Sequence, residues 1–262
     1  MSRPTPPTAP SGAPAPRRVT PLPEGRVRLY GVHPVEAALA NPARIVHRLL
    51  LTENAARRLA KVLSERAIAP EPARPKDLDR MLGADTVHQG AYLETEPLNE
   101  PTLAEVARLT TPGRPLIVLD QVTDPHNVGA ILRTAAVFGA SGLIMTRRHS
   151  PPLDGTLAKA ASGALELVPI ALVVNLSRAL DELKDMGVKT VGLDGEATAL
   201  IEDEPNDRPT ALILGAEGRG LRQLTRETAD RLCRIRTSGA LSSLNVSNAA
   251  AVALHVLARP PA

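Results

Sequence analysis

The sequence is poor in cysteine, in aromatic residues and in long apolar runs. Its one cysteine, Cys233, excludes an internal disulfide framework and is typical of a reducing compartment, so we expect a cytoplasmic protein. The only aromatic residues are Tyr30, Tyr92 and Phe138, which argues against modules that read single-stranded RNA by stacking bases on aromatic platforms. No run of about 18 apolar residues is present, so we expect no membrane span. No apolar segment follows the N-terminal arginines, so we expect no secretory signal.

Metal-binding and hydrolase motifs are also missing. The histidines are scattered, without the Cys/His spacing of zinc sites, and we expect no metal: they are His33, His47, His88, His126, His149 and His255. A Gly-x-Ser-x-Gly nucleophile elbow is absent, which gives no support to a serine hydrolase.

The charge is distributed unevenly along the 262 residues, although the formal net charge is only +3. Residues 1–66 hold 11 Lys and Arg against 4 Asp and Glu, a local net charge of +7. A basic segment favours a polyanionic partner, with nucleic acid as the first candidate, although an ordinary solvated surface with a basic tail would have the same charge. Residues 1–25 are rich in Pro, Ala and Thr, and we predict that they are disordered.

The hydrophobic pattern divides the rest of the chain into two parts. Residues 26–97 read as a small α/β domain, with a strand at 46–52 and an amphipathic helix at 55–67. Residues 98–114 contain several prolines and read as a linker. From residue 115 to 262, apolar strand-like runs alternate with helical segments, which predicts a mostly parallel sheet covered on both faces. The predicted strands are residues 116–119, 143–145, 167–174, 189–193, 211–214 and 232–235, and the predicted helices are residues 128–138, 153–164, 176–186 and 221–229.

Polar loops follow three of these strands, where parallel sheets place their binding sites. The first loop contains Asn127, which we expect to cap a helix, and Arg133, whose side chain could reach the same region. By pattern alone, a capped helix with one exposed arginine explains this loop as well. The second loop is rich in glycine and holds Glu217, which is either a turn residue or a functional carboxylate.

The third loop, around Ser243 and Asn245, leads into a helix-forming stretch that has no formal charge from Val246 to Leu257. A helix without a charged stripe should be buried, against the rest of the fold or a second subunit. A polar turn on a buried helix is typical of a binding loop on a rigid support.

These three loops resemble the motifs of the SpoU/TrmH family of RNA ribose 2′-O-methyltransferases. The motifs stand here as Thr123-Asp-Pro-His-Asn-Val-Gly-Ala-Ile-Leu-Arg-Thr-Ala135, Leu212-Ile-Leu-Gly-Ala-Glu-Gly-Arg-Gly-Leu221 and Ser242-Ser-Leu-Asn-Val-Ser-Asn-Ala-Ala250. The region from Leu29-Tyr-Gly-Val-His-Pro-Val-Glu-Ala-Ala-Leu39 to Val87-His-Gln-Gly-Ala91 resembles the L30e-like RNA-binding domain of the family's rRNA branch.

The resemblance implies a trefoil-knotted α/β methyltransferase domain, a homodimer, and S-adenosylmethionine (AdoMet) as the methyl donor. It implies that AdoMet contacts Gly215, Ile235 and Leu244. It also implies that catalysis and RNA placement involve these positions: Asn127, Arg133, Glu217, Ser243 and Asn245. The implied substrate is a guanosine ribose in 23S rRNA.

Three alternatives remain open from the sequence. A tRNA ribose methyltransferase of the same family is less favoured, because the tRNA branch usually lacks the N-terminal domain. A non-catalytic RNA-binding protein, such as a ribosome-assembly factor, would not need the three motifs. A dinucleotide-dependent oxidoreductase would place its glycine-rich loop after the first strand of the sheet, and here that loop comes later.

Overall fold

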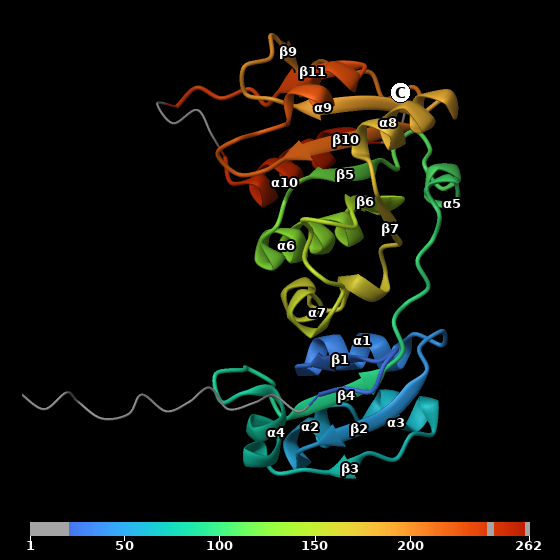
Figure 1. The fold of residues 1–262 in the computed structure, drawn as a ribbon, viewed down its shortest axis with the longest axis vertical. Coiled ribbons are helices and arrows are strands. Elements are labelled where there is room, and N and C mark those ends of the chain that lie inside the picture. Colours follow the sequence, from blue (N-terminus) through green and yellow to red (C-terminus); the bar gives the residue numbers. More distant parts are fainter. Residues whose placement is uncertain (1–20, 240–243, 260–262) are drawn as a thin grey trace, which may run out of the picture.

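The computed structural model describes residues 21–239 and 244–259. The molecule is elongated, with two sheets stacked along its long axis (Figure 1). The N-terminal sheet has the strand order β1-β4-β2-β3, with β4 antiparallel to both β1 and β2. Its strands are β1 (Val27–Tyr30), β2 (Val46–Leu51), β3 (Glu71–Pro72) and β4 (Ala91–Thr95).

Four helices cover this sheet: α1 (Val32–Ala40), α2 (Glu53–Arg58), α3 (Ala60–Arg66) and α4 (Pro75–Leu82). The single helix expected at residues 55–67 is two helices, because the buried Leu59 leaves helical geometry (φ −95°, ψ 5°) and separates α2 from α3. Hydrophobic periodicity cannot reveal such a break, since both helices bury side chains toward the same core.

The second sheet is entirely parallel and has the order β7-β6-β5-β10-β8-β11-β9. Its strands are β5 (Leu116–Asp120), β6 (Gly142–Thr146), β7 (Ile170–Val173), β8 (Lys189–Leu193), β9 (Ala199–Leu200), β10 (Thr210–Gly215) and β11 (Arg231–Arg234). The parallel α/β architecture predicted from the alternation of strands and helices is therefore confirmed.

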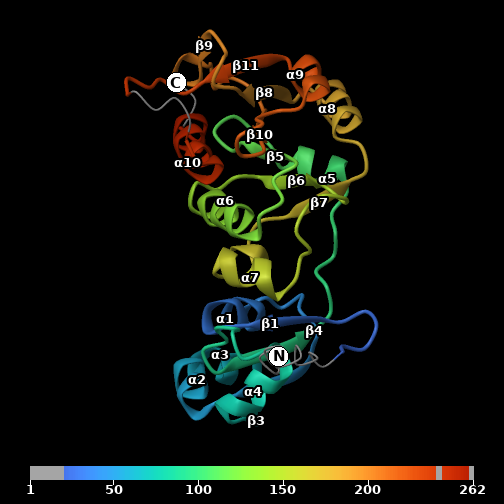
Figure 2. The same ribbon diagram turned by 60° about the vertical axis from the view of Figure 1, so that its left-hand side comes forward.

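Helices lie on both faces of the parallel sheet, as Figure 2 shows from a second direction. One face packs against α6 (Pro125–Val137) and α10 (Val246–Leu257), with the short turn η2 (Ile201–Asp203) beside α10. Helix α7 (Gly155–Ala161) and the short turn η1 (Ala164–Glu166) pack against α6 and against the N-terminal half. The other face packs against α5 (Leu103–Arg108), α8 (Leu176–Asp185) and α9 (Gln223–Thr228). The alternation of β5 explains this arrangement, because Ile117 and Leu119 enter the first core while Leu116 and Val118 enter the second.

The C-terminal helix α10 is buried mainly within its own chain. Ala250, Ala253 and Leu254 are fully buried, whereas Val252 is 39 % exposed. Intramolecular packing therefore accounts for the apolar inner face of this helix, while its exposed outer face carries no Asp, Glu, Lys or Arg. Of the two alternatives that the sequence left open, burial against the rest of the fold applies to the inner face of α10, and burial against a second subunit stays a prediction for its outer side. The knot that the resemblance implies stays a prediction, because residues 240–243 lie outside the described residues.

Candidate active site

Two of the three predicted loops meet because β5 and β10 are neighbouring parallel strands. The register pairs Asp120 with Gly215, so both strands end at the same level of the sheet. The loop after β5 leads into α6, whose N-cap is Asp124: its side chain accepts a hydrogen bond from His126 N. We had expected Asn127 to cap this helix, but Asp124 does so instead. Asn127 lies in the first turn, where its side chain is free for another role.

Asn127, Glu217 and Asn245 form a closed polar triangle. The side-chain amide of Asn127 donates to Oε2 of Glu217 at 3.3 Å. The amide of Asn245 donates to Oε1 of Glu217 at 2.8 Å and to Oδ1 of Asn127 at 3.0 Å. One residue comes from each of the three motifs, so the structure joins loops that are about 30 to 120 residues apart in the chain, as the separations of 28, 90 and 118 residues show.

The orientation of Asn245 is fixed by its second role as the N-cap of α10. Its Oδ1 accepts a hydrogen bond from Ser247 N at 2.9 Å and from Ser247 Oγ at 2.6 Å. An N-cap uses its oxygen to satisfy an otherwise unpaired helix N–H group. The amide nitrogen is thereby directed toward Glu217, and the helix cap orients the triangle.

The glycine-rich loop that carries Glu217 is a tight turn closed on itself. Ala216 and Gly220 exchange both of their backbone hydrogen bonds, at 3.1 and 2.9 Å. Gly218 and Gly220 have positive φ angles of 76° and 66°, which glycine adopts without strain. A Cβ atom at Gly215 would overlap the carbonyl group of Gly220. Glycine is therefore needed here to close the loop, and phosphate binding is not required to explain it.

A cavity of about 390 Å³ opens beside the triangle at the carboxyl ends of β8, β10 and β11. It is lined by Gly215, Ile235 and Leu244, the three positions that the family resemblance assigned to AdoMet, and also by Glu217. Small-molecule sites commonly have volumes of roughly 300–1,000 Å³. The structure thus gathers the predicted cofactor positions around one space and places a member of the triangle on its wall.

Sequence reasoning missed two ion pairs that support this site. The carboxylate of Asp120 is fully buried at the end of β5 and accepts hydrogen bonds from the backbone N (3.0 Å) and Nε (2.6 Å) of Arg222. On the far side of the cavity, Arg226 lies 2.8 Å from Asp194. The only sequence signal was an acidic residue at a strand end, such as Asp120 at the end of β5. Its partner is 102 residues away, and sequence spacing does not identify it.

Arg133 does not join the triangle. It is exposed on α6, and its side chain makes no hydrogen bond or ion pair with any residue in the described parts of the chain. Six residues of α-helix turn the chain through about 240°, so Arg133 and Asn127 project from different sides of α6. Ser243, the remaining predicted catalytic residue, lies outside the described residues.

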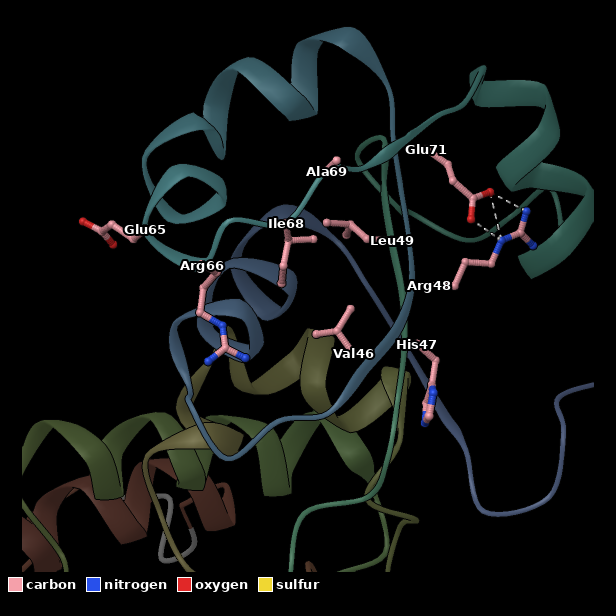
Figure 3. Close-up of a pocket in the computed structure, with 9 residues that line it drawn as sticks. All are labelled: Val46, His47, Arg48, Leu49, Glu65, Arg66, Ile68, Ala69 and Glu71. Atoms are coloured by element: carbon pink, nitrogen blue, oxygen red, sulfur yellow. Dashed lines mark hydrogen bonds and ion pairs between the residues drawn. The ribbon is translucent and has the colours of Figure 1, made fainter.

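A second, larger cavity of about 590 Å³ lies in the N-terminal half, far from the triangle in the chain and in the fold. Figure 3 shows Val46, Leu49 and Ile68 at its centre, with Arg48 and Glu71 to one side. Arg48 is already paired with Glu71 at 2.8 Å. The smaller cavity, where the polar triangle lies, is therefore the candidate active site.

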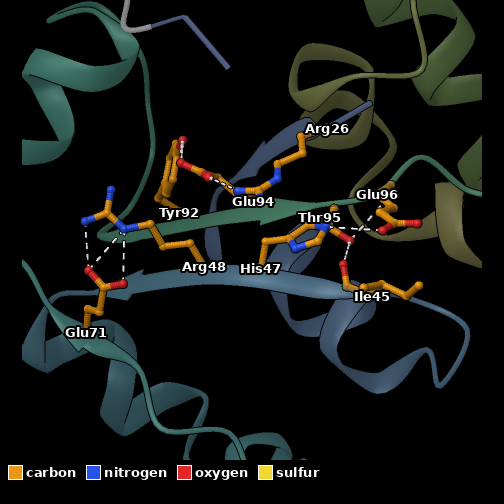
Figure 4. Close-up of polar contacts among 9 residues, drawn as sticks. All are labelled: Arg26, Ile45, His47, Arg48, Glu71, Tyr92, Glu94, Thr95 and Glu96. Carbon is orange, nitrogen blue, oxygen red and sulfur yellow. Dashed lines mark hydrogen bonds and ion pairs between the residues drawn. The ribbon is translucent and has the colours of Figure 1, made fainter. Parts of the chain in front are cut away.

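Other polar groups of the N-terminal sheet also have partners (Figure 4). His47 lies 3.3 Å from Glu96, and Arg26 lies 3.5 Å from Glu94. Burial, together with a hydrogen bond to Glu94, raises the pKa of Tyr92. Arg26 and Arg48, two of the basic residues of this segment, are thus paired with carboxylates.

Within the described residues, no group of three or more His, Cys, Asp or Glu side chains could hold a metal ion. The same residues include no helix that is both long and apolar enough to cross a membrane.

Comparison with known families identifies both halves of the chain. Residues 114–255 match the SpoU rRNA Methylase family, and residues 28–101 match the family described as RNA 2′-O ribose methyltransferase substrate binding. The first match contains the triangle and the cavity. The second contains the N-terminal sheet.

Curated relatives share nearly the full length. The chain is 40% identical over 239 residues to the 23S rRNA (guanosine-2′-O-)-methyltransferase RlmB of Pseudomonas aeruginosa, covering 88% of this chain and 96% of the relative. It is 41% identical over 240 residues to RlmB of Vibrio cholerae, with the same coverage of 88% and 96%.

Solved structures share the fold. The SpoU methyltransferase AviRb from Streptomyces viridochromogenes, in complex with the cofactor AdoMet, superposes with a TM-score of 0.74 at 26% identity over 89% of each chain. The TrmH/SpoU tRNA modifying enzyme of A. aeolicus matches over 60% of this chain and 79% of its own, with a TM-score of 0.50 at 25% identity.

Proposed function

This chain belongs to the SpoU rRNA methylase family, and we propose that it transfers a methyl group from AdoMet to the ribose 2′-oxygen of a guanosine in 23S rRNA. The observation that carries the site assignment is the triangle of Asn127, Glu217 and Asn245 on the wall of a cavity lined by Gly215, Ile235 and Leu244. A polar cluster of this kind can orient a hydroxyl group, and the adjoining cavity can hold a methyl donor.

The residues around the cavity fit AdoMet. The backbone of Gly215 and Ala216 can approach a ligand closely, and the apolar side chains of Ile235 and Leu244 can cover its uncharged parts. Glu217 lines the same cavity and would offer a negative charge to a sulfonium group held there. When bound, AdoMet supplies an electrophilic methyl group on a positively charged sulfur.

The protein's own contribution is to align the two reactants. The target 2′-hydroxyl must lie in line with the methyl group, and holding two reactants in such geometry can supply ~7–11 kcal/mol of the barrier reduction. We propose that Asn127 and Asn245 hold Glu217 so that its carboxylate orients this hydroxyl group. Ser243 and Arg133 are proposed to contact the RNA beside the target ribose.

The N-terminal half is proposed to bind rRNA outside the target nucleotide. Its match to the substrate-binding family supports this role, as do the RlmB relatives, which share both halves. The second candidate, tRNA, is supported by the A. aeolicus enzyme, whose match covers only 60% of this chain. The extra half therefore favours rRNA.

We further propose that the protein is a homodimer that pairs through the outer surface of α6 and α10. Val137 is 80 % exposed on α6, and Val252 is 39 % exposed on α10, which packs directly against α6. The ring of His255 lies edge-on to Phe138 between the two helices, with ring centroids 5.9 Å apart. Arg133 precedes Val137 by one helical turn, so it would face the second copy and could act across the interface.

The deciding experiment is methyl transfer from labelled AdoMet to 23S rRNA and to tRNA in parallel, followed by mapping of the modified ribose. We expect label on one guanosine of 23S rRNA and none on tRNA. Label on tRNA alone would favour the second candidate. If AdoMet binds but neither RNA is labelled, the substrate assignment is wrong, and if AdoMet does not bind, a non-catalytic RNA-binding protein is favoured.

A further inference from the structure

The two halves of the molecule are joined by a buried ion pair that the catalytic site does not use. Arg44, in the loop between α1 and β2, donates from Nε to both carboxylate oxygens of Glu166 at 3.1 Å and from Nη2 to Oε1 at 2.8 Å. The two side chains are only 2% and 4% exposed. Glu166 lies in η1, after α7, so the pair connects the N-terminal half to the methyltransferase half.

The hydrogen bonding around this pair is nearly complete. Asn41 donates to Oε2 of Glu166 at 2.8 Å, and Nη1 of Arg44 donates to the backbone oxygen of Glu96 at 2.6 Å. A buried ion pair needs such additional bonds to offset the cost of removing both charges from water. The planar guanidinium group accepts only a narrow range of partner positions, so the pair fixes direction as well as distance.

A second set of contacts holds the opposite end of the same junction. Oε1 of Gln89 accepts hydrogen bonds from Nζ of Lys159 on α7 at 2.6 Å and from the backbone N of Val32 at 3.2 Å. Gln89 has a positive φ of 53°, a conformation that costs free energy for a residue other than glycine. Nearby, Tyr30 Oη lies 3.2 Å from Thr156 Oγ1.

Two glycines at the junction leave no room for a side chain. A Cβ atom at Gly155, the first residue of α7, would lie 2.6 Å from the backbone oxygen of Arg28. A Cβ atom at Gly31 would lie 2.7 Å from Nζ of Lys159. The apolar core is also continuous across the junction, since Leu29 and Val32 belong to the same cluster as Leu157 and Leu165. The two halves therefore pack against each other here, beside a cavity of about 440 Å³ that Arg44 and Glu166 help to line.

We propose that Arg44 and Glu166 are positioning residues for methyl transfer. Their ion pair sets the N-terminal half relative to the triangle of Asn127, Glu217 and Asn245, so that RNA held by the N-terminal half presents its target ribose to the triangle. This inference rests on the proposed function. The protein would recognise a large folded RNA through two surfaces held at a fixed distance, one on the N-terminal half and one at the triangle. Neither Arg44 nor Glu166 needs to touch the RNA.

The test is the variant Glu166→Gln, which keeps the shape of the side chain and removes its charge. Arg44 then stays buried without a counter-charge, and the junction loosens. We expect kcat/KM for 23S rRNA to fall by roughly tenfold to a hundredfold, mainly through KM, because an RNA that contacts both halves at once binds more weakly when their spacing varies. The dissociation constant for AdoMet should change by less than about twofold, because the cavity shares no partner with this pair.

The matched control is Glu182→Gln, the same chemical change in the exposed pair of Arg178 and Glu182 on α8. It should leave KM for RNA unchanged. Spin labels at Glu36→Cys and Glu227→Cys, in the two halves, report the junction directly, because the native Cys233 is fully buried. The distance distribution between the labels should broaden in Glu166→Gln and stay narrow in Glu182→Gln. An unchanged KM for RNA or an unchanged distribution in Glu166→Gln would overturn the proposal.

If Glu166→Gln does not fold, Asn41→Ala removes one hydrogen bond from the pair, together with a local one from the backbone N of Ala43, and should raise KM for RNA by a smaller factor. An unchanged KM in that variant would also overturn the proposal. Failure of the proposed function has a different signature, because the wild-type protein would then not methylate 23S rRNA at all.

Discussion

The amide of Asn245 donates a 2.8 Å hydrogen bond to Oε1 of Glu217, which joins the N-terminus of α10 to the glycine-rich loop after β10. The oxygen of the same amide caps α10 by accepting from Ser247. One side chain therefore couples helix capping to the orientation of the proposed catalytic carboxylate.

This coupling predicts that Asn245→Asp separates the two roles. The aspartate can still cap α10, but it cannot donate to Glu217 and places a second negative charge beside it. We expect the methylation rate at saturating substrates to fall by at least about tenfold while the thermal midpoint changes little. Asn175→Asp, the same change at the N-cap of α8, is the control and should retain full activity. Normal activity in Asn245→Asp would exclude Glu217 orientation as a function of Asn245.

The packing of the glycine-rich loop predicts that Gly215→Ala weakens AdoMet binding. The new Cβ atom would overlap Gly220, so the loop that lines the cavity must move. We expect the dissociation constant measured by calorimetry to rise by about tenfold or more, equivalent to ~1.4 kcal/mol. Gly195→Ala is a matched control, because Gly195 lines the same cavity and an added Cβ there would meet nothing within 4 Å. Equal affinities for the two variants would contradict the proposed cofactor site.

The exposed position of Arg133 predicts a role in RNA binding without proton transfer. Arginine stays protonated in proteins, and here no described residue pairs with it. We expect Arg133→Lys to reduce kcat/KM for RNA by about tenfold, because a lysine cannot make bidentate phosphate contacts. The dependence of rate on pH should keep its shape. A shift of the pH profile in this variant would instead indicate that Arg133 takes the proton.

The burial pattern of α10 predicts different outcomes for two glutamate substitutions. Val252→Glu places a charge on the exposed outer surface, and we expect a folded monomer by gel filtration with light scattering. Ala250→Glu places a charge at a fully buried position, where we expect loss of the folded protein. Circular dichroism distinguishes the two. A Val252→Glu protein that remains dimeric would show that the outer surface of α10 is not the interface.

The predictions made from sequence were accurate where a local pattern carries the information. Strand β8 was predicted with its observed bounds, because an isolated apolar run between turns has few alternatives. The start of α6 was misplaced by three residues, because Asp124 and Asn127 are both residue types that favour a helix cap, and their order alone does not select between them. Which of the two residues caps α6 depends on whose side chain remains free to accept the helix N–H hydrogen bond once the loop packs against the sheet.

The sequence by itself determined the parallel α/β class and the three polar loops at strand ends, because strand and helix periods and turn residues are local properties of the chain. Only the tertiary structure decided that Asn127, Glu217 and Asn245 meet, that Asp120 pairs with Arg222, and that Arg44 and Glu166 join the two halves. Those contacts depend on strand order and on packing between distant segments. The physical reason is that hydrogen bonds and ion pairs act over a few ångströms, while the residues that make them are separated by up to 122 positions in the chain.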